Sequence, residues 1–167
     1  MAMNRRPTIG APLLLAVLLG AAFSQVGFAA EPVKIVVLEP GTGGLVTLLD
    51  REVASAAAQH RVPFVQITAE WCVPCKKLRA SLGDPLMQDA FAGTYIIRVD
   101  ADAWKKELKK AGFDHPAIPV FFAVDANARP TRAKIDGGAW GEDIPPNMAP
   151  PLKRFFAEQI AAAGERH

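Results

Sequence analysis

Both cysteines of the chain lie in one short segment, Trp71 to Lys76, and are separated by two residues. The apolar run Pro63–Thr68 ends just before this segment and predicts a buried strand. Pro74 stands where the first turn of a helix tolerates proline. The chain is therefore expected to pass directly from a buried strand into a helix that begins at the cysteines. This junction constrains the fold more than any other feature of the sequence.

The spacing of the two cysteines favours chemistry over a structural crosslink. A disulfide between Cys72 and Cys75 would close a very small loop, which stabilises a fold little. At the start of a helix, the free N–H groups and the helix dipole lower the pKa of the first thiol. We expect Cys72 to be an exposed nucleophile, and Cys75, about one helical turn deeper, to be more shielded and to resolve mixed disulfides.

Neighbouring residues are expected to support this redox site. Trp71 is interpreted as flanking the cysteines, and Lys76 adds positive charge. Pro74 removes one N–H donor and stiffens the loop that also contains Val73. The alternatives are an inert disulfide or half of a metal site. A zinc site needs about four ligands. The three histidines of the chain, His60, His115 and His167, are scattered without ligand spacing, so no metal is expected.

Hydrophobic periodicity predicts strands and helices in alternation. The expected strands are 33–38, 63–68, 95–99, 120–124 and 131–135. The expected helices are 45–59, a helix continuing over 76–81, a piece beginning at 85 after an Asp84 N-cap, 103–111, and a closing helix marked by Leu152, Phe155, Phe156 and Ile160. The proline-rich stretch 143–151 is expected to be irregular. This order predicts an α/β fold with a central mixed β-sheet flanked by helices.

The N-terminus has the pattern of an export signal. Arg5 and Arg6 precede an apolar stretch of 13 residues, Ala11–Phe23, and a small-residue region follows. Residues 1–29 are therefore interpreted as a signal peptide and 30–167 as the mature domain. The alternative is an uncleaved membrane anchor. Export predicts a periplasmic location, where a disulfide is the default state of a cysteine pair.

Charge gives no reason to propose nucleic-acid binding. The chain has 19 basic and 17 acidic residues, and Arg5 with Arg6 account for the excess of two. No basic run remains. The lysines between 105 and 110 alternate with Glu107 and Leu108, which is typical of a solvated helix face.

The segment Ala69–Lys76 resembles the active site of the thioredoxin superfamily, and the similarity covers roughly 63–135. A second segment, Ala117–Phe122, resembles the start of the cis-proline strand of that family. The resemblance implies a thioredoxin-like fold in which Pro119 packs beside a redox-active disulfide and Ile118 offers backbone hydrogen bonds to a substrate. The exported thioredoxin-like domains, such as the C-terminal periplasmic domain of thiol:disulfide interchange proteins, look most similar.

Two features depart from the family pattern. Thioredoxins usually carry a buried aspartate six residues before the first cysteine, where it helps to deprotonate the second. Gln66 occupies that position here and cannot accept a proton, while Glu70 is expected to be exposed. The segment Gly137–Pro151, with Trp140 and Met148, is also longer than the usual connection. It could form part of a partner-binding surface, although local packing is the simpler interpretation.

The resemblance implies dithiol–disulfide exchange without a bound cofactor. The Trp-Cys-X-Pro-Cys pattern and Ile118 before the proline resemble reducing members, so we expect an exported reductase. Its expected partners are disulfide-containing exported proteins, held transiently as mixed disulfides, and a membrane thiol carrier that donates electrons. A disulfide oxidase or isomerase is the alternative within this class. A redox-sensing adaptor without enzymatic activity is the alternative from another class.

Overall fold

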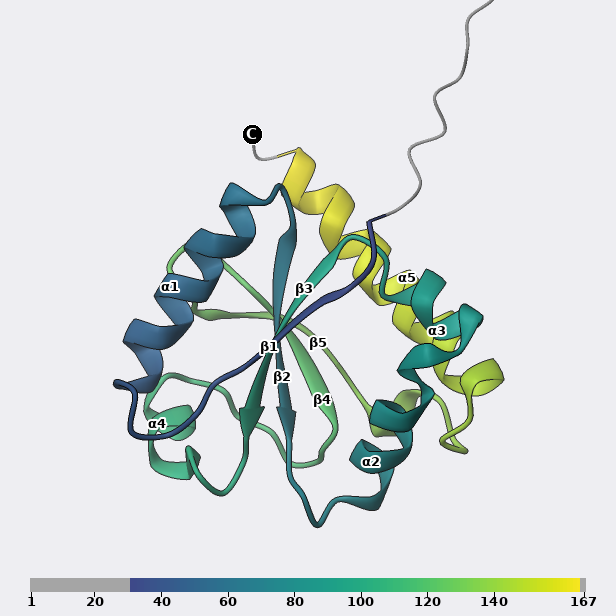
Figure 1. Cartoon of the computed structure of the whole chain (residues 1–167), viewed down its shortest axis with the longest axis horizontal. Coiled ribbons are helices and arrows are strands. Elements are labelled where there is room, and N and C mark those ends of the chain that lie inside the picture. Colours follow the sequence, from purple (N-terminus) through teal and green to yellow (C-terminus); the bar gives the residue numbers. More distant parts are fainter. Residues whose placement is uncertain (1–30, 166–167) are drawn as a thin grey trace, which may run out of the picture.

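The central sheet has five strands in the order β1-β3-β2-β4-β5 (Figure 1). The structure is a computed structural model that describes residues 31–165. β1, β3 and β2 are parallel, whereas β4 runs antiparallel to β2 and β5 antiparallel to β4. The strands are β1 (Lys34–Val37), β2 (Val62–Thr68), β3 (Thr94–Asp100), β4 (Val120–Val124) and β5 (Pro130–Asp136). The expected mixed sheet is therefore confirmed.

Helices cover both faces of this sheet (Figure 1). The elements are α1 (Leu45–Ala58), α2 (Val73–Ala80), the 3₁₀ turn η1 (Ser81–Gly83), α3 (Pro85–Ala90), α4 (Lys105–Lys110), the 3₁₀ turn η2 (Gly137–Ala139) and α5 (Pro145–Gly164). α1 and α4 pack on one face, where they bury residues such as Leu49 and Leu108 against Val65 and Ile97. α2, α3 and α5 pack on the other face.

Aromatic side chains fill the layer beneath α5. Phe156 lies at 4.8 Å from Phe64, 4.9 Å from Phe91 and 5.4 Å from Phe121, measured between ring centroids. Tilted and edge-to-face pairs of this kind each add about 0.5–1.5 kcal/mol beyond the area that they bury. The three partners come from β2, the end of α3 and β4, so Phe156 joins the last helix to the sheet.

The expectation that 143–151 is irregular is wrong, because α5 begins at Pro145. Pro145 and Pro146 occupy the first turn, whose N–H groups have no partner within a helix. Pro150 and Pro151 lie inside the helix and each remove one backbone hydrogen bond. The helix persists because tertiary packing outweighs this loss. Its buried residues are Met148, Ala149, Leu152, Phe155 and Phe156.

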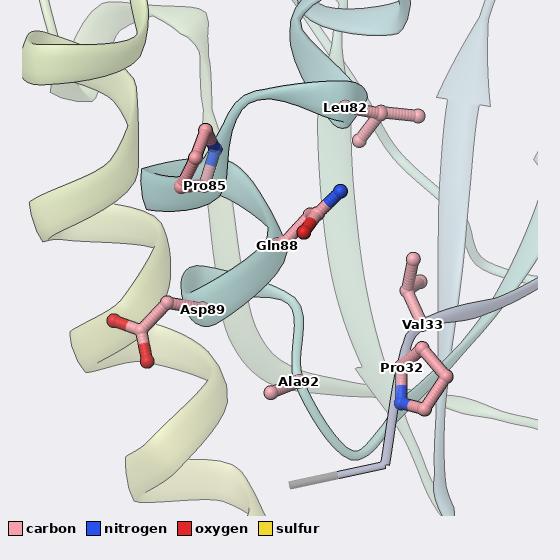
Figure 2. Close-up of a pocket in the computed structure, with 7 residues that line it drawn as sticks. All are labelled: Pro32, Val33, Leu82, Pro85, Gln88, Asp89 and Ala92. Atoms are coloured by element: carbon pink, nitrogen blue, oxygen red, sulfur yellow. The ribbon is translucent and has the colours of Figure 1, made fainter.

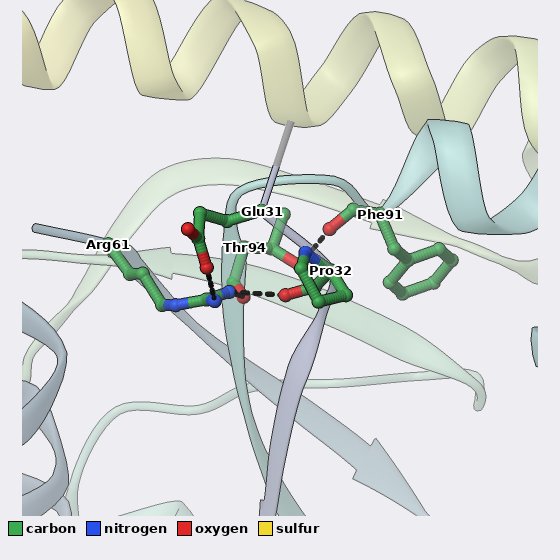
Figure 3. A network of polar contacts seen from close by, with 5 residues as sticks. All are labelled: Glu31, Pro32, Arg61, Phe91 and Thr94. Carbon is green, nitrogen blue, oxygen red and sulfur yellow. Dashed lines mark hydrogen bonds and ion pairs between the residues drawn. The ribbon is translucent and has the colours of Figure 1, made fainter. Parts of the chain in front are cut away.

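The beginning of the described chain is tied to the sheet by Arg61 (Figure 3). The Arg61 guanidinium donates to the carbonyl oxygens of Pro32 and Thr94 and forms an ion pair of 3.0 Å with Glu31. This network fixes the chain just before β1 beside β3. The expected signal peptide, residues 1–29, and its alternative as an anchor lie outside the described residues. Between residues 31 and 165, no helix has the length and apolarity to span a membrane.

Candidate active site

Cys72 and Cys75 form a disulfide at the junction of β2 and α2, with their Cα atoms 5.2 Å apart. Cys72 is the N-cap of α2, and its Sγ accepts a hydrogen bond of 3.2 Å from the backbone N–H of Cys75. Pro74 lies in the first helical turn, as its position in the sequence indicates. The Cys72 sulfur therefore faces the N–H groups at the positive end of the helix, an arrangement that favours a thiolate.

Cys72 and Cys75 are both buried in the disulfide-bonded protein. Cys75 is the more shielded, at 1% exposure, but Cys72 is only 3% exposed. The expected exposed nucleophile is therefore corrected. Ala69 is buried with the disulfide, and Ala101 and Ile118 pack against this small cluster.

Two exposed apolar side chains flank the disulfide. Trp71 is 65% exposed and Val73 is 59% exposed. The indole Nε1 of Trp71 donates a hydrogen bond of 2.6 Å to Asp102 Oδ2, which fixes the ring beside the loop after β3. Exposed apolar patches of this kind commonly mark sites of protein interaction.

A shallow hollow of about 200 Å³ lies next to Trp71. It is lined by Trp71, Ala101, Asp102, Lys105, His115, Pro116 and Ile118. His115, interpreted from the sequence as a loop residue, lines this hollow and places its Nδ1 at 2.8 Å from the carbonyl oxygen of Phe113. Asp102 and Lys105 were not expected at the site from the sequence. The available signal was that helical segments separate the two expected strands, which favours parallel pairing and brings the segments that follow the strands to one edge of the sheet.

Ile118 and Pro119 lie on the other side of the disulfide. The peptide bond between them is cis. The Ile118 carbonyl oxygen lies 3.6 Å from Cys72 Sγ, and because a disulfide sulfur carries no hydrogen this is a contact, not a hydrogen bond. Pro119 is buried at the start of β4, and its carbonyl oxygen accepts from Gly137 N–H at 3.0 Å. These contacts bring the start of β4 against the Cys72 sulfur.

The charged residues near the cysteines point outward or pair with one another. Lys76 is exposed on α2. Glu70 is also exposed, at 76% of its side chain, and forms an ion pair of 2.9 Å with Arg79. Glu70 is therefore engaged on the surface. The structure gives it no hydrogen bond to Cys75.

Gln66 is buried on β2, at 2% exposure. Its Oε1 accepts a hydrogen bond of 2.9 Å from Arg98 Nε, across the pairing of β2 with β3. Burial lowers the pKa of Arg98, and repulsion from Arg79 lowers it further, while Glu70 acts in the opposite direction. Gln66 stands where the resemblance leads one to expect a buried acid, and a cation lies beside it on the neighbouring strand.

The long connection before α5 packs locally. Trp140 is 7% exposed and Met148 fully buried, so both contribute to the core. Trp140 Nε1 donates to Asp143 Oδ1 at 3.0 Å, and Asp143 lies 3.9 Å from Lys77 Nζ on α2. Ile144 is exposed at 43%. The connection therefore packs into the core, reaches the active-site helix through Asp143, and exposes Ile144 as its large apolar side chain.

A second hollow, of about 480 Å³, lies between the start of β1 and α3 (Figure 2). It is lined by Pro32, Val33, Leu82, Pro85, Gln88, Asp89 and Ala92. β1 and β2 both run parallel to β3, so this hollow lies toward the opposite end of the sheet from the disulfide. It contains no cysteine and plays no part in the site. Among the described residues, no group of histidine, cysteine and acidic side chains is arranged to hold a metal ion.

Comparison with known proteins gives two sequence relatives of related chemistry. No protein-family model matches the chain. It is 28% identical over 92 residues to the thiol:disulfide interchange protein DsbD of Ralstonia nicotianae, a match that covers 52% of this chain and 15% of that protein. It is 33% identical over 72 residues to a thioredoxin H-type of Chlamydomonas reinhardtii, covering 43% and 61%. The chain therefore spans less than two thirds of either relative.

Solved structures support the fold. The disulphide isomerase of Xylella fastidiosa superposes with a TM-score of 0.53 at 18% identity, over 74% of this chain and 96% of that one. A mutant thioredoxin of Halobacterium salinarum gives 0.50 at 17% identity, over 78% and 95%. The chain has a thioredoxin-like fold that carries a Cys-X-X-Cys disulfide, and its sequence relatives are found in the thioredoxin superfamily.

Proposed function

We propose that this protein is an exported thiol–disulfide oxidoreductase that reduces the disulfides of partner proteins through Cys72 and Cys75. The observation that carries the proposal is the Cys72–Cys75 disulfide at the start of α2, with the Cys72 sulfur facing a backbone N–H. The two sequence relatives add support, since one is a thiol:disulfide interchange protein and the other a thioredoxin.

The reaction consists of two exchanges. In the reduced protein, the Cys72 thiolate attacks one sulfur of the partner's disulfide, and the other sulfur leaves as a thiolate that takes up a proton. The Cys75 thiol then loses its proton to solvent, and its thiolate attacks Cys72 Sγ. The bond between Cys72 and the partner breaks, and the partner leaves with two reduced sulfurs. Two electrons have passed to the partner, and the Cys72–Cys75 disulfide is restored.

The residues around the disulfide have distinct roles in this proposal. Trp71 and Val73 offer exposed apolar surface on which a partner can rest. Ile118 and Pro119 form the substrate-binding side, because the Ile118 carbonyl contacts the attacking sulfur. Pro74 fixes the first turn of the active-site helix.

Export and the direction of electron flow belong to the same proposal. Export to the periplasm rests on the signal-peptide pattern of residues 1–29, with 30–167 as the mature domain, and a membrane thiol carrier would then supply the electrons. A reduction potential of about −270 mV supports a reductase, whereas a value of about −120 mV indicates a disulfide oxidase. Mass measurement of the exported protein, expected to begin at Ala30, tests the signal peptide.

The central experiment measures reduction of insulin disulfides by the purified protein with a chemical electron donor. We expect turnover by the wild type and none by Cys72→Ser. Cys75→Ser should retain partners as stable mixed disulfides, because the resolving thiol is missing. If wild type and Cys72→Ser are equally inactive with every disulfide substrate, the protein is a redox-sensing adaptor and the enzymatic proposal is wrong.

A further inference from the structure

The active-site helix lies over Arg98, a half-buried cation whose side chain is held by a neutral amide. Arg98 donates to the Oε1 of Gln66, a neutral side chain that is 2% exposed. Between residues 31 and 165, none of the ion pairs involves Arg98. Partial burial disfavours the charged form of Arg98 and lowers its pKa, so water solvates this cation incompletely. Glu70 attracts Arg98 electrostatically but forms no ion pair with it.

This cation lies beneath the turn of α2 that carries Cys75. Leu78 of α2 packs in the same apolar cluster as Phe64 of β2 and Ile96 of β3. Two residues further along each strand, about 6.6 Å, come Gln66 and Arg98 on the same face of the sheet. These strands run toward the disulfide and α2 runs back from it. The helical turn before Leu78, which contains Cys75, therefore lies level with Gln66 and Arg98.

Arg79 supports the same placement. Cys75 and Arg79 are four residues apart on α2 and share one helical face. Repulsion from Arg79 contributes to the lowered pKa of Arg98, so the two guanidinium groups lie near each other. Arg98 is therefore close to the helical face that also presents Cys75.

The other charges around this face are already paired or exposed. Glu70 pairs with Arg79 at 2.9 Å, and Asp143 is shared between Trp140 and Lys77. Lys76 is exposed to solvent. Asp100 accepts from the backbone N–H groups of residues 102 and 103. Arg98 is thus a cation near Cys75 whose charge Glu70 offsets only in part, since the pKa of Arg98 is lowered on balance.

We propose that Arg98, held by Gln66, is a positioning residue that stabilises the thiolate of Cys75 during resolution of the mixed disulfide. This inference rests on the proposed exchange reaction and adds a specific electrostatic device to it. Arg98 cannot take up a proton, because a guanidinium remains protonated in proteins. The proton of Cys75 therefore passes to water, and the positive charge makes its release easier. The chain uses a fixed cation where the resemblance implies a proton-accepting carboxylate.

The test follows the resolving step alone. Reduced protein is mixed with dithiobis(nitrobenzoate), which releases one coloured thiolate when Cys72 attacks and a second when Cys75 resolves the mixed disulfide. A unit charge about 10 Å away in a protein environment shifts a pKa by about one unit. We expect Arg98→Gln to raise the pH midpoint of the second release by about one unit. The rate at neutral pH should fall only about threefold, because a thiolate of higher pKa is a better nucleophile.

Two matched variants separate charge from structure. Arg98→Lys keeps the charge and should retain the wild-type midpoint, and Arg132→Gln removes an exposed arginine from the edge strand β5 and should change nothing. An unchanged midpoint in folded Arg98→Gln overturns the proposal. Equal shifts in Arg98→Gln and Arg98→Lys also overturn it, because they would indicate a structural effect.

If Arg98→Gln does not fold, Glu70→Gln provides the test from the opposite direction. It removes the carboxylate that acts on Arg98 and pairs with Arg79, so the positive charge felt at Cys75 increases and the midpoint should fall. A midpoint that stays or rises overturns the proposal. The reagent contains no protein, so the outcome is independent of insulin reduction. Loss of insulin reduction with the Arg98 effect intact contradicts the proposed function alone.

Discussion

Tyr95 lies in the apolar layer beneath α1, where its hydroxyl donates a hydrogen bond of 2.7 Å to Glu52 Oε2. Tyr95 is 2% exposed and Glu52 is 7% exposed. Burial, and then the hydrogen bond to the Glu52 carboxylate, raise the pKa of Tyr95 to about 12 from an ordinary value of 10.0. The unfolded chain therefore loses this proton at a lower pH than the folded protein does.

The sign of the effect on stability follows from this difference. Below pH 10 both states keep the proton, and the contribution of Tyr95 to stability is complete. Between about pH 10 and 12 the unfolded state releases its proton while the folded state retains it, so the free energy of unfolding falls as the pH rises. Two pKa units correspond to about 2.7 kcal/mol, and we expect a loss of about 2–3 kcal/mol by pH 12.

Urea unfolding at a series of alkaline pH values measures this loss, with Tyr95→Phe as the matched variant. Other groups titrate alike in both proteins, so the difference between their unfolding free energies isolates Tyr95. The chain contains a single tyrosine. Tyrosinate absorbance of the folded protein therefore follows this residue directly. A tyrosinate midpoint near pH 10, or a difference between the two proteins that stays constant up to pH 12, would refute the reasoning.

Three further predictions concern the core, α5 and the cysteines. Phe156→Ala should lower the free energy of unfolding by about 3–5 kcal/mol, because it leaves a cavity among the aromatic rings, and Phe156→Leu should cost less; equal losses in urea unfolding would contradict this. Pro150→Ala should raise the free energy of unfolding by about 1–3 kcal/mol, because it restores a helix hydrogen bond to the carbonyl oxygen of Pro146 and removes a steric clash; a lower free energy of unfolding would contradict this. In the reduced protein near neutral pH, Cys72 should be alkylated before Cys75; equal labelling by peptide mass spectrometry would count against the role of the helix terminus.

The sequence predicted the architecture because the residues that begin and end its helices and strands are strong local signals. Val120–Val124 is an apolar run between Pro119 and a turn, and the structure has a strand with the same bounds. Asp84 followed by Pro85 predicted a helix start, and Asp84 Oδ1 accepts from Leu86 N–H as an N-cap. Each signal depends on neighbours within a few residues, which is the range over which helix and strand propensities act.

The sequence was misleading where distant contacts decide. The prolines between 145 and 151 disfavour a helix locally, yet Met148 and Leu152 bury their side chains against the sheet and keep α5 helical. The expectation that Cys72 is exposed was wrong for a related reason. Ala101 and Ile118, which close over the disulfide, come from segments far along the chain.

The same limit applies to the chemistry of the candidate site. The sequence identified Gln66 as a neutral residue at the expected acid position but gave no sign of Arg98, 32 residues later. The two meet because Gln66 pairs with Arg98 in the register of β2 and β3, and a shift of that register by one residue would turn Arg98 to the opposite face of the sheet. Trp71 and Asp102 are brought together across the same pair of strands, 31 residues apart. The electrostatics around Cys75 are therefore set by strand register, so the loss of an acid at one position can be judged only together with the residue that pairs across from it.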